Sequence, residues 1–177
     1  MKHAFIETKR LYLRPFIPQD LAQLHEFYGD EKVMRYIGKG PRTKEETQQE
    51  LNRFIADWQK HNLSPFAAIH KQTGKLIGRS GLYLNQRSPY PQLGYVLHRD
   101  YWHQGFATEV AKASLNYGFN TRNFPHIHGF VMLENNVSHH ILEKLGMWLE
   151  TDRFKYNDRL YARYGISLES YFGSAVA

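Results

Sequence analysis

The fold of this chain is decided by the stretch Leu93-Gly94-Tyr95-Val96-Leu97-His98-Arg99-Asp100-Tyr101-Trp102-His103-Gln104-Gly105-Phe106-Ala107-Thr108-Glu109. An apolar strand pattern ends in a polar turn that contains Gly105, and a helical repeat begins directly after it. The first N–H groups of a helix have no partner within the helix, and a turn of this kind directs them toward an anion. We therefore expect a phosphate-binding turn here.

The remaining sequence predicts elements on both sides of this turn. Apolar and polar residues alternate as in strands, recur at helical spacing, or are interrupted by glycine and proline. We expect strands over residues 10–16, 66–70, 76–84, 92–97, 125–133, 147–156 and 160–168, helices over 21–28, 44–58, 106–117 and 135–145, and a loop over 85–91. This order predicts an α+β fold with a mixed sheet flanked by helices.

In the last helix we expect Val137, Ile141 and Leu145 to face inward and Gly146 to cap the C-terminal end. Residues 43–46 have the form of a capping box before helix 44–58, and Gly74 is placed for a positive φ between strands 66–70 and 76–84. Gly78 and Gly81 in the second of these strands indicate a bulge or a close approach of the backbone, required by packing or by a ligand.

The composition is that of a globular protein. The 177 residues are 42% hydrophobic and 23% charged, and no linker divides them, so we expect one domain over residues 1–177. The chain has no cysteine, which excludes disulfides, thiolate nucleophiles and thiolate metal sites. No segment reaches the roughly 18 apolar residues that span a bilayer, and no signal peptide is recognisable. We therefore expect a cytoplasmic protein without membrane contact.

The net charge of +6 favours anionic partners, which include phosphate ligands, acidic protein surfaces and nucleic acid. The basic residues are scattered among acids, as on an ordinary solvated surface, and we do not expect nucleic acid to be a substrate. Two histidine pairs, His126 with His128 and His139 with His140, raise the question of a metal site. No acid stands at ligand spacing from either pair, so we expect surface or packing histidines and no metal.

Four motifs resemble those that bind acetyl-CoA in the GNAT N-acetyltransferases. They are Leu93-Gly94-Tyr95, residues 101–109, Asn135-Asn136-Val137-Ser138, and Leu142-Glu143-Lys144-Leu145-Gly146. With residues 8–15 and 33–37, they are most similar to the branch that contains the ribosomal-protein N-terminal serine and alanine acetyltransferases. The resemblance covers nearly the whole chain. It implies a mostly antiparallel mixed sheet whose central strands splay apart.

The resemblance implies acetyl-CoA as the cosubstrate. Main-chain N–H groups of the turn would bind the pyrophosphate, and the pantetheine arm would pair with strand 92–97 as an added strand does. The implied cofactor-binding residues are Tyr95, Val96, Leu97, Trp102, His103, Gln104, Gly105, Phe106, Ala107, Thr108 and Asn135. His103 departs from the branch, which usually has glycine there.

The resemblance also implies direct transfer of acetyl to a primary amine without a covalent enzyme intermediate. A strand N–H would stabilise the oxyanion of the tetrahedral intermediate. Asn135 and Ser138 are the implied catalytic residues, with Asn135 bonded to pantetheine and Ser138 protonating the departing thiolate. Many family members use a tyrosine for this protonation, but the corresponding residue here is Leu142. Capping of the helix start is the alternative role for Asn135 and Ser138.

The general base is left open. An α-amino group has a pKa of about 8 and a lysine about 10, so a base or a water relay must remove a proton. The branch often has glutamate directly before Leu-Gly-Tyr, but the residue here is Gln92, which cannot accept a proton. Asp100, nearby histidines and water are the alternatives.

The implied acceptor is the N-terminal α-amino group of a protein, for example a ribosomal protein, and a small amine is the other option. Residues 33–41 and 153–162 are expected to frame this acceptor. We expect a monomer or a homodimer. The alternative function is a catalytically inactive CoA-binding or basic ribonucleoprotein-associated module, which the residues Gln92 and Leu142 favour.

Overall fold

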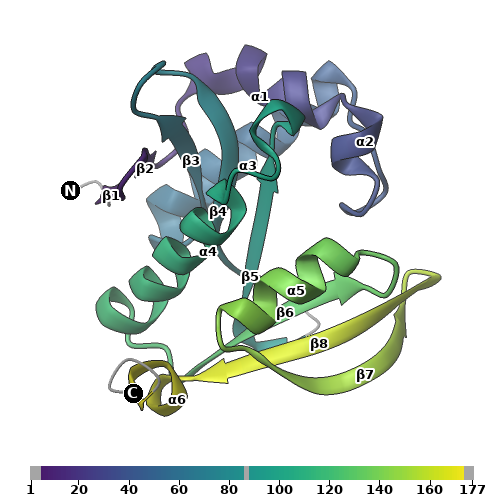
Figure 1. Ribbon diagram of the computed structural model, residues 1–177. Coiled ribbons are helices and arrows are strands. Elements are labelled where there is room, and N and C mark those ends of the chain that lie inside the picture. The colour runs from purple at the N-terminus through teal and green to yellow at the C-terminus, as the bar shows by residue number, and fades with distance from the viewer. Residues whose placement is uncertain (1–4, 86–87, 174–177) are drawn as a thin grey trace. The chain divides into compact units, whose positions relative to one another are not determined.

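The computed structural model describes residues 5–85 and 88–173. Within these residues, one sheet contains eight strands in the order β1-β2-β3-β4-β5-β6-β8-β7 (Figure 1). The strands are β1 (Ile6–Glu7), β2 (Leu11–Arg14), β3 (Pro65–His70), β4 (Leu76–Asn85), β5 (Ser88–Leu97), β6 (His126–Met132), β7 (Trp148–Tyr156) and β8 (Arg159–Ser167). The pairs β1–β2, β2–β3, β3–β4, β6–β8 and β7–β8 are antiparallel. β5 and β6 are parallel, through Gln92 opposite His128 and Leu93 opposite Gly129.

Helices connect these strands as the sequence predicts. They are α1 (Leu21–Tyr28), α2 (Glu31–Met34), α3 (Lys44–His61), α4 (Phe106–Asn116), α5 (Asn136–Lys144) and α6 (Leu168–Gly173), with 3-10 turns at Pro18–Asp20 and Arg99–Tyr101 and a π-helical turn at Tyr117–Thr121. The mixed α and β arrangement with a mostly antiparallel sheet is therefore confirmed. β1, α2, α6 and the π-helical turn were not predicted. No helix in residues 5–85 or 88–173 is long and apolar enough to cross a membrane.

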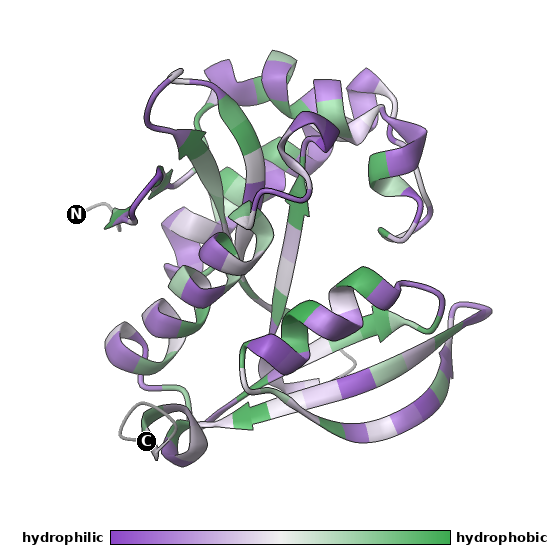
Figure 2. Cartoon of the chain, in the orientation of Figure 1, coloured by the Kyte–Doolittle hydropathy of each residue, from purple (hydrophilic) through white to green (hydrophobic). Residues whose placement is uncertain are grey.

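The described residues form two compact units, each considered by itself below. The first consists of residues 5–81 and 95–113, and the second of residues 82–85, 88–94 and 114–173. Strands β4 and β5 and helix α4 run through both units. Figure 2 shows hydrophobic and hydrophilic residues alternating along α4, as expected for a helix that buries one face. Val110, Ala111 and Leu115 on this helix are fully buried.

The first unit has a core between α1, α3 and the strands. Leu24 and Phe27 of α1 and Leu51 and Phe54 of α3 are almost completely buried, as the helical spacing in the sequence predicts. α3 begins with the expected capping box: Thr43 Oγ1 accepts from the Glu46 N–H at 3.2 Å, and Glu46 Oε2 accepts from the Thr43 N–H at 2.9 Å. The amphipathic helix and its start are therefore both specified locally.

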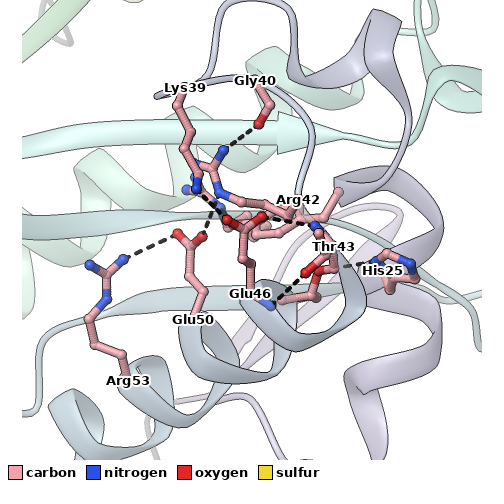
Figure 3. A network of polar contacts seen from close by, with 11 residues as sticks. His25, Lys39, Gly40, Arg42, Thr43, Glu46, Glu50 and Arg53 are labelled. Atoms are coloured by element: carbon pink, nitrogen blue, oxygen red, sulfur yellow. Dashed lines mark hydrogen bonds and ion pairs between the residues drawn. The ribbon is translucent and has the colours of Figure 1, made fainter. Parts of the chain in front are cut away.

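Charged side chains extend this cap into a network that holds the preceding loop (Figure 3). Lys39 pairs with Glu46, and Arg42 donates to the main-chain oxygen of Gly40. Glu50 lies 3.5 Å from Arg42 and 3.1 Å from Arg53. The loop after α2 is thus held by side chains of the first two turns of α3.

The hairpin of β3 and β4 turns through Gly74, which has the expected positive φ of 67°. The pairing shifts by one residue beside Gly78, as a β-bulge requires. A Cβ at position 78 would lie 2.4 Å from the main-chain oxygen of Val96, and one at position 81 would lie 2.7 Å from Cα of Pro65. Both glycines therefore serve close packing of main chains, which was one of the two expected reasons.

The predicted loop over residues 85–91 is wrong in its second half, because β5 already begins at Ser88. The prediction relied on Pro89 and Pro91 as strand breakers. These prolines lie two positions apart, so the donors that they lack belong to the same edge of the strand. A strand can therefore include both of them. Residues 86–87 lie outside the described residues.

In the second unit, α5 follows β6 and ends at Lys144. Gly146, two residues later, has a φ of 80° and donates its N–H to Glu143 O at 2.9 Å. The helix and its glycine cap are as predicted. The expected inward position of Val137 is wrong, because its side chain is 63% exposed. The buried stripe runs instead through Leu142, because the bare main chain of Gly129 leaves room for this side chain: a Cβ at position 129 would lie 2.7 Å from Leu142 Cδ1.

β7 and β8 form the predicted closing hairpin. Asn157 and Asp158 connect them with φ values of 47° and 60°, the conformation of a two-residue type I′ turn. β7 lies at the edge of the sheet, and its register with β8 shifts between Leu149 and Thr151 and again between Thr151 and Phe154. At the first of these shifts, Glu150 is an extra residue in β7.

Candidate acetyl-CoA site and other polar clusters

The turn between β5 and α4 has the conformation that an anion-binding loop needs. His103 and Gly105 have φ values of 58° and 80°, so two residues of the turn lie in the left-handed region. For a residue with a side chain, this region costs roughly 1–2 kcal/mol. His103 therefore carries a cost that glycine, the usual residue in the similar branch, would avoid.

Main-chain N–H groups in this turn are left without protein partners. Among the residues that the structure describes, none accepts a hydrogen bond from the N–H groups of residues 103–108. Phe106 is buried, whereas His103, Gln104 and Gly105 are exposed. The turn thus presents consecutive donors at the surface, next to the positive end of the α4 dipole.

Arg10 and Glu109 anchor the turn to the beginning of β2. Arg10 Nη1 donates to the main-chain oxygen of Gln104 at 2.8 Å, and Arg10 Nε donates to Glu109 Oε2 at 2.7 Å. Thr8 Oγ1 and the Arg10 N–H also donate to Glu109 Oε1, at 2.6 and 2.9 Å. Because C=O and N–H point in opposite directions across a trans peptide, the bond to Gln104 O turns the Gly105 N–H away from Arg10. Sequence reasoning assigned no such role to Arg10, Thr8 or Glu109.

Glu109→Ala is expected to lower the free energy of unfolding by about 2–3 kcal/mol, because Arg10 and Thr8 lose a charged acceptor. Burial acts to raise the pKa of Glu109, but the hydrogen bonds from Thr8 and Arg10 outweigh it, and the pKa lies below its ordinary value. A lowered folded-state pKa means that this stabilisation is complete above the unfolded pKa of about 4.3 and is lost as the pH falls through the folded pKa.

Urea unfolding of the wild type and the variant at pH 7, 5 and 3.5 tests this expectation. The stability difference should shrink toward the lowest pH. Glu134→Ala, which removes an exposed acid, is the matched control and should stay within about 0.5 kcal/mol of the wild type. A difference that is equally large at all three pH values would contradict the role given to the Glu109 carboxylate.

Tyr95, Val96 and Leu97 form the end of β5. Val96 and Leu97 are 4% and 5% exposed, and Val96 belongs to the core of the first unit. Trp102 Nε1 donates to the Leu97 main-chain oxygen at 2.9 Å, so the indole ties the turn back to the strand. Because the side chains of Val96 and Leu97 are buried in the protein, this part of β5 can contact a ligand through its main chain.

Asn135 and Ser138 lie at the start of α5 in the second unit. Asn135 caps the helix, because its Oδ1 accepts from the Ser138 N–H at 3.2 Å. The capping role weighed for Asn135 is therefore confirmed, while its contact with pantetheine stays a prediction. Ser138 contributes only its main chain to this cap. Its half-buried hydroxyl has no hydrogen-bond partner within the described residues.

Two departures from the resembled pattern have structural explanations. Leu142 is 2% exposed against Gly129, so a tyrosine ring does not fit at this position. Gln92 is 5% exposed and donates from Nε2 to the Tyr83 hydroxyl at 2.8 Å. A Cβ at Gly94 would lie 2.8 Å from the same Tyr83 ring, which explains the glycine of Leu93-Gly94-Tyr95. The alternative base Asp100 has a side chain that is 72% exposed.

The expectation that no acid joins His126 and His128 is wrong. Glu150 Oε1 lies 2.9 Å from His126 Nε2, and Glu150 Oε2 lies 3.0 Å from His128 Nε2. Burial lowers the pKa of His128, and nearby His126 and Arg163 act in the same direction, whereas Glu150 opposes them. The acid is 24 positions from His126 in the sequence, so only the pairing of the strands brings it there.

Comparisons with known proteins agree with this geometry. The acetyltransferase (GNAT) domain family matches residues 10–148. The uncharacterized N-acetyltransferase YnaD of Bacillus subtilis is 32% identical over 142 residues, which cover 80% of this chain and 81% of that protein. Spermidine N(1)-acetyltransferase of Escherichia coli K12 is 29% identical over 139 residues, which cover 78% of this chain and 73% of that protein.

Solved structures share the fold. An acetyltransferase of the GNAT family from Bacillus anthracis has a TM-score of 0.82 and 28% identity, covering 94% of this chain and 99% of that chain. The ribosomal-protein-S5-alanine acetyltransferase of Vibrio fischeri has a TM-score of 0.77 and 18% identity, covering 95% of this chain and 98% of that chain. At this identity the two proteins share the fold alone. The family match spans well over half of the sequence and includes the turn, β5 and α5. The chain therefore belongs to the GNAT family of acetyltransferases.

Proposed function

We propose that this enzyme transfers acetyl from acetyl-CoA to the N-terminal α-amino group of a protein, acting as a single domain. The observation that carries the cofactor part is the turn between β5 and α4, where the N–H groups of residues 103–108 have no acceptor among the described residues. Consecutive unpaired donors at a helix start suit a pyrophosphate. Acetyl transfer is the reaction of the GNAT family, to which the chain belongs.

The residues have distinct roles in this proposal. The turn from Trp102 to Thr108 binds the pyrophosphate, and the main chain of Tyr95–Leu97 pairs with the pantetheine arm. Asn135 bonds to pantetheine in addition to capping α5. Ser138 protonates the thiolate of CoA as it leaves, which its unpaired hydroxyl supports. The lone pair of the acceptor amine attacks the thioester carbon, and the C–S bond breaks. The amine gives one proton to water, and water returns a proton to the Ser138 hydroxyl.

The choice of acceptor rests on charge as well as on resemblance. Spermidine, the substrate named for one relative, is a polycation, whereas this chain carries a net charge of +6. Like charges slow the encounter between an enzyme and its substrate, so a neutral or acidic protein segment is the better partner. The resemblance of the sequence motifs to the ribosomal-protein N-terminal acetyltransferases favours the same class of acceptor.

An acceptor panel tests the proposal. Release of CoA thiol is measured with hexapeptides that begin with free serine or alanine, with the same peptides blocked at the N-terminus but containing a lysine, and with spermidine. We expect the highest kcat/KM for a free N-terminus and no turnover for the blocked peptides. A higher kcat/KM for spermidine than for every peptide would overturn the choice of acceptor. Acetyl-CoA binding without any turnover, together with salt-dependent RNA affinity, would support the inactive-module alternative.

A further inference from the structure

We propose that His126, His128 and Glu150 form a binding site for a divalent transition-metal ion, with Zn²⁺ as the expected occupant. One ligand atom from each of the three residues lies within 4.8 Å of the others. Imidazole nitrogen and carboxylate oxygen are ligands that Zn²⁺ prefers, and two histidines with one glutamate are an established zinc set. This inference is independent of the proposed acceptor.

The separations fit a metal after small side-chain movements. Each Nε2 faces one oxygen of the carboxylate, at 2.9 Å for His126 and 3.0 Å for His128. Zinc bonds of about 2.0–2.2 Å in tetrahedral geometry place ligand atoms roughly 3.3–3.5 Å apart. The two histidine–carboxylate separations must therefore widen by a few tenths of an ångström, and the ligand atoms, which now lie within 4.8 Å of one another, must close to the same spacing. A water molecule would complete the coordination.

Three neighbouring strands build this cluster. His128 is the register partner of Gly165 on β8, and Gly165 is in turn the partner of Trp148 on β7. A Cβ at position 165 would lie 1.9 Å from Glu150 Oε1 and 2.6 Å from His126 Nε2. Only glycine leaves space for the carboxylate and the imidazole to meet above β8. Because Gly165 has no side chain, the three ligand residues can meet over this part of β8.

The β-bulge in β7 places Glu150 in the space above Gly165. The register shifts between Leu149, which faces Tyr164, and Thr151, which faces Arg163, so Glu150 is the extra residue. An extra residue in a strand changes the direction of its side chain, and bulges of this kind commonly aim residues at functional sites. The carboxylate is largely buried, with 16% of its side chain exposed.

A second layer of contacts orients His128. Ser88 Oγ lies 2.7 Å from His128 Nδ1 and accepts from the Tyr90 N–H at 2.9 Å. The other lone pair of this oxygen can accept a hydrogen bond from Nδ1–H. With Nδ1–H donating there, an ion that replaces the proton between Nε2 and Glu150 can bind the Nε2 lone pair, as in zinc sites where the second ring nitrogen donates to a fixed acceptor. The ring of Tyr90 covers the cluster, 4.9 Å from the ring of His126.

Arg163 competes with an ion for the carboxylate of Glu150. Its Nε lies 3.0 Å from Glu150 Oε2, so the carboxylate already has one positive neighbour. The Arg163 side chain is 37% exposed and can move into solvent when an ion binds. A bound ion would join β6 to the edge strand β7 across β8 and thereby stabilise that edge of the sheet.

The test uses the full chain, freed of metal by a chelator and transferred to a chelator-free buffer at pH 7.5. Calorimetric titration with ZnCl₂ is expected to show one site, and saturation should raise the Tm by about 5 °C. Glu150→Gln and His126→Gln should each weaken Zn²⁺ binding at least about tenfold. Arg163→Leu should tighten it. His140→Gln, which changes an exposed histidine outside the cluster, is the matched control and should bind like the wild type.

A measurement on the wild type keeps the test valid should a variant fail to fold. Co²⁺ in place of Zn²⁺ should give the visible absorption of a tetrahedral site, and Zn²⁺ should abolish it by displacement. The proposal is overturned by absence of one-to-one binding in the wild type, or by affinities that neither cluster substitution changes. An equal loss in His140→Gln would show scattered binding by surface histidines and would also overturn it.

Discussion

Gly105→Glu is expected to raise the dissociation constant for acetyl-CoA at least about 100-fold. The variant carboxylate would lie in the turn that presents the N–H groups of residues 103–108, and it would repel the pyrophosphate there. The φ of 80° at position 105 adds a conformational cost for any side chain. Isothermal titration with acetyl-CoA measures the effect directly.

Two controls separate charge from conformation at this turn. Gly105→Gln has nearly the size of Gly105→Glu and the same backbone cost, but no charge, so we expect it to bind much more tightly than Gly105→Glu. His103→Gly should retain binding, because φ at this position is 58° and glycine adopts it freely. Equal losses in the two Gly105 variants would show that conformation, and not repulsion of phosphate, governs the effect. No binding by the wild type would contradict the cofactor site itself.

Ser138→Ala is expected to lower kcat about 100-fold and to leave KM for acetyl-CoA nearly unchanged. General acid catalysis is worth about 10²–10⁴ in rate, and this substitution removes the proton donor proposed for the leaving thiolate. The cap of α5 uses the main-chain N–H of Ser138, which alanine retains. Steady-state kinetics over a range of acetyl-CoA concentrations therefore report chemistry with little effect on folding.

Ser138→Thr and Asn135→Ala are the controls for the acid. Ser138→Thr retains a hydroxyl and should recover part of the lost rate. Asn135→Ala removes the cap at 3.2 Å and should lower the free energy of unfolding by about 1 kcal/mol, which Ser138→Ala should not. A kcat of Ser138→Ala within threefold of the wild type would exclude Ser138 as the acid and leave helix-start packing as its role.

Most of the successful predictions were based on short-range sequence patterns. The capping box at Thr43, the glycine turn at Gly74 and the helical stripe of α4 depend on residues within a few positions of one another. The turn before α4 was predicted for the same reason. The start of β5 was missed because Pro89 and Pro91 were read as breakers, although a strand can carry both on one edge.

Long-range contacts could not be predicted from the sequence. Arg10 and Glu109 are 99 positions apart, and nothing in either neighbourhood indicates that one anchors the other. Glu150 reaches His126 and His128 only because of the register of three strands, a bulge and the small Gly165. The inward face of α5 was misjudged at Val137 because the space at Gly129, opposite Leu142, decides which residues are buried.

The irregular pairing of β7 also bears on how the chain avoids polymerising. An edge strand offers free main-chain groups to which a strand of another molecule can add, and long straight edges invite fibres. β7 lies at one edge of the sheet and has two register shifts, with Asp152, Arg153 and Lys155 along the same strand. At the other edge, β1 is only two residues long. Within residues 5–85 and 88–173, neither edge offers a straight, uncharged template, so molecules at high concentration should stay apart along both.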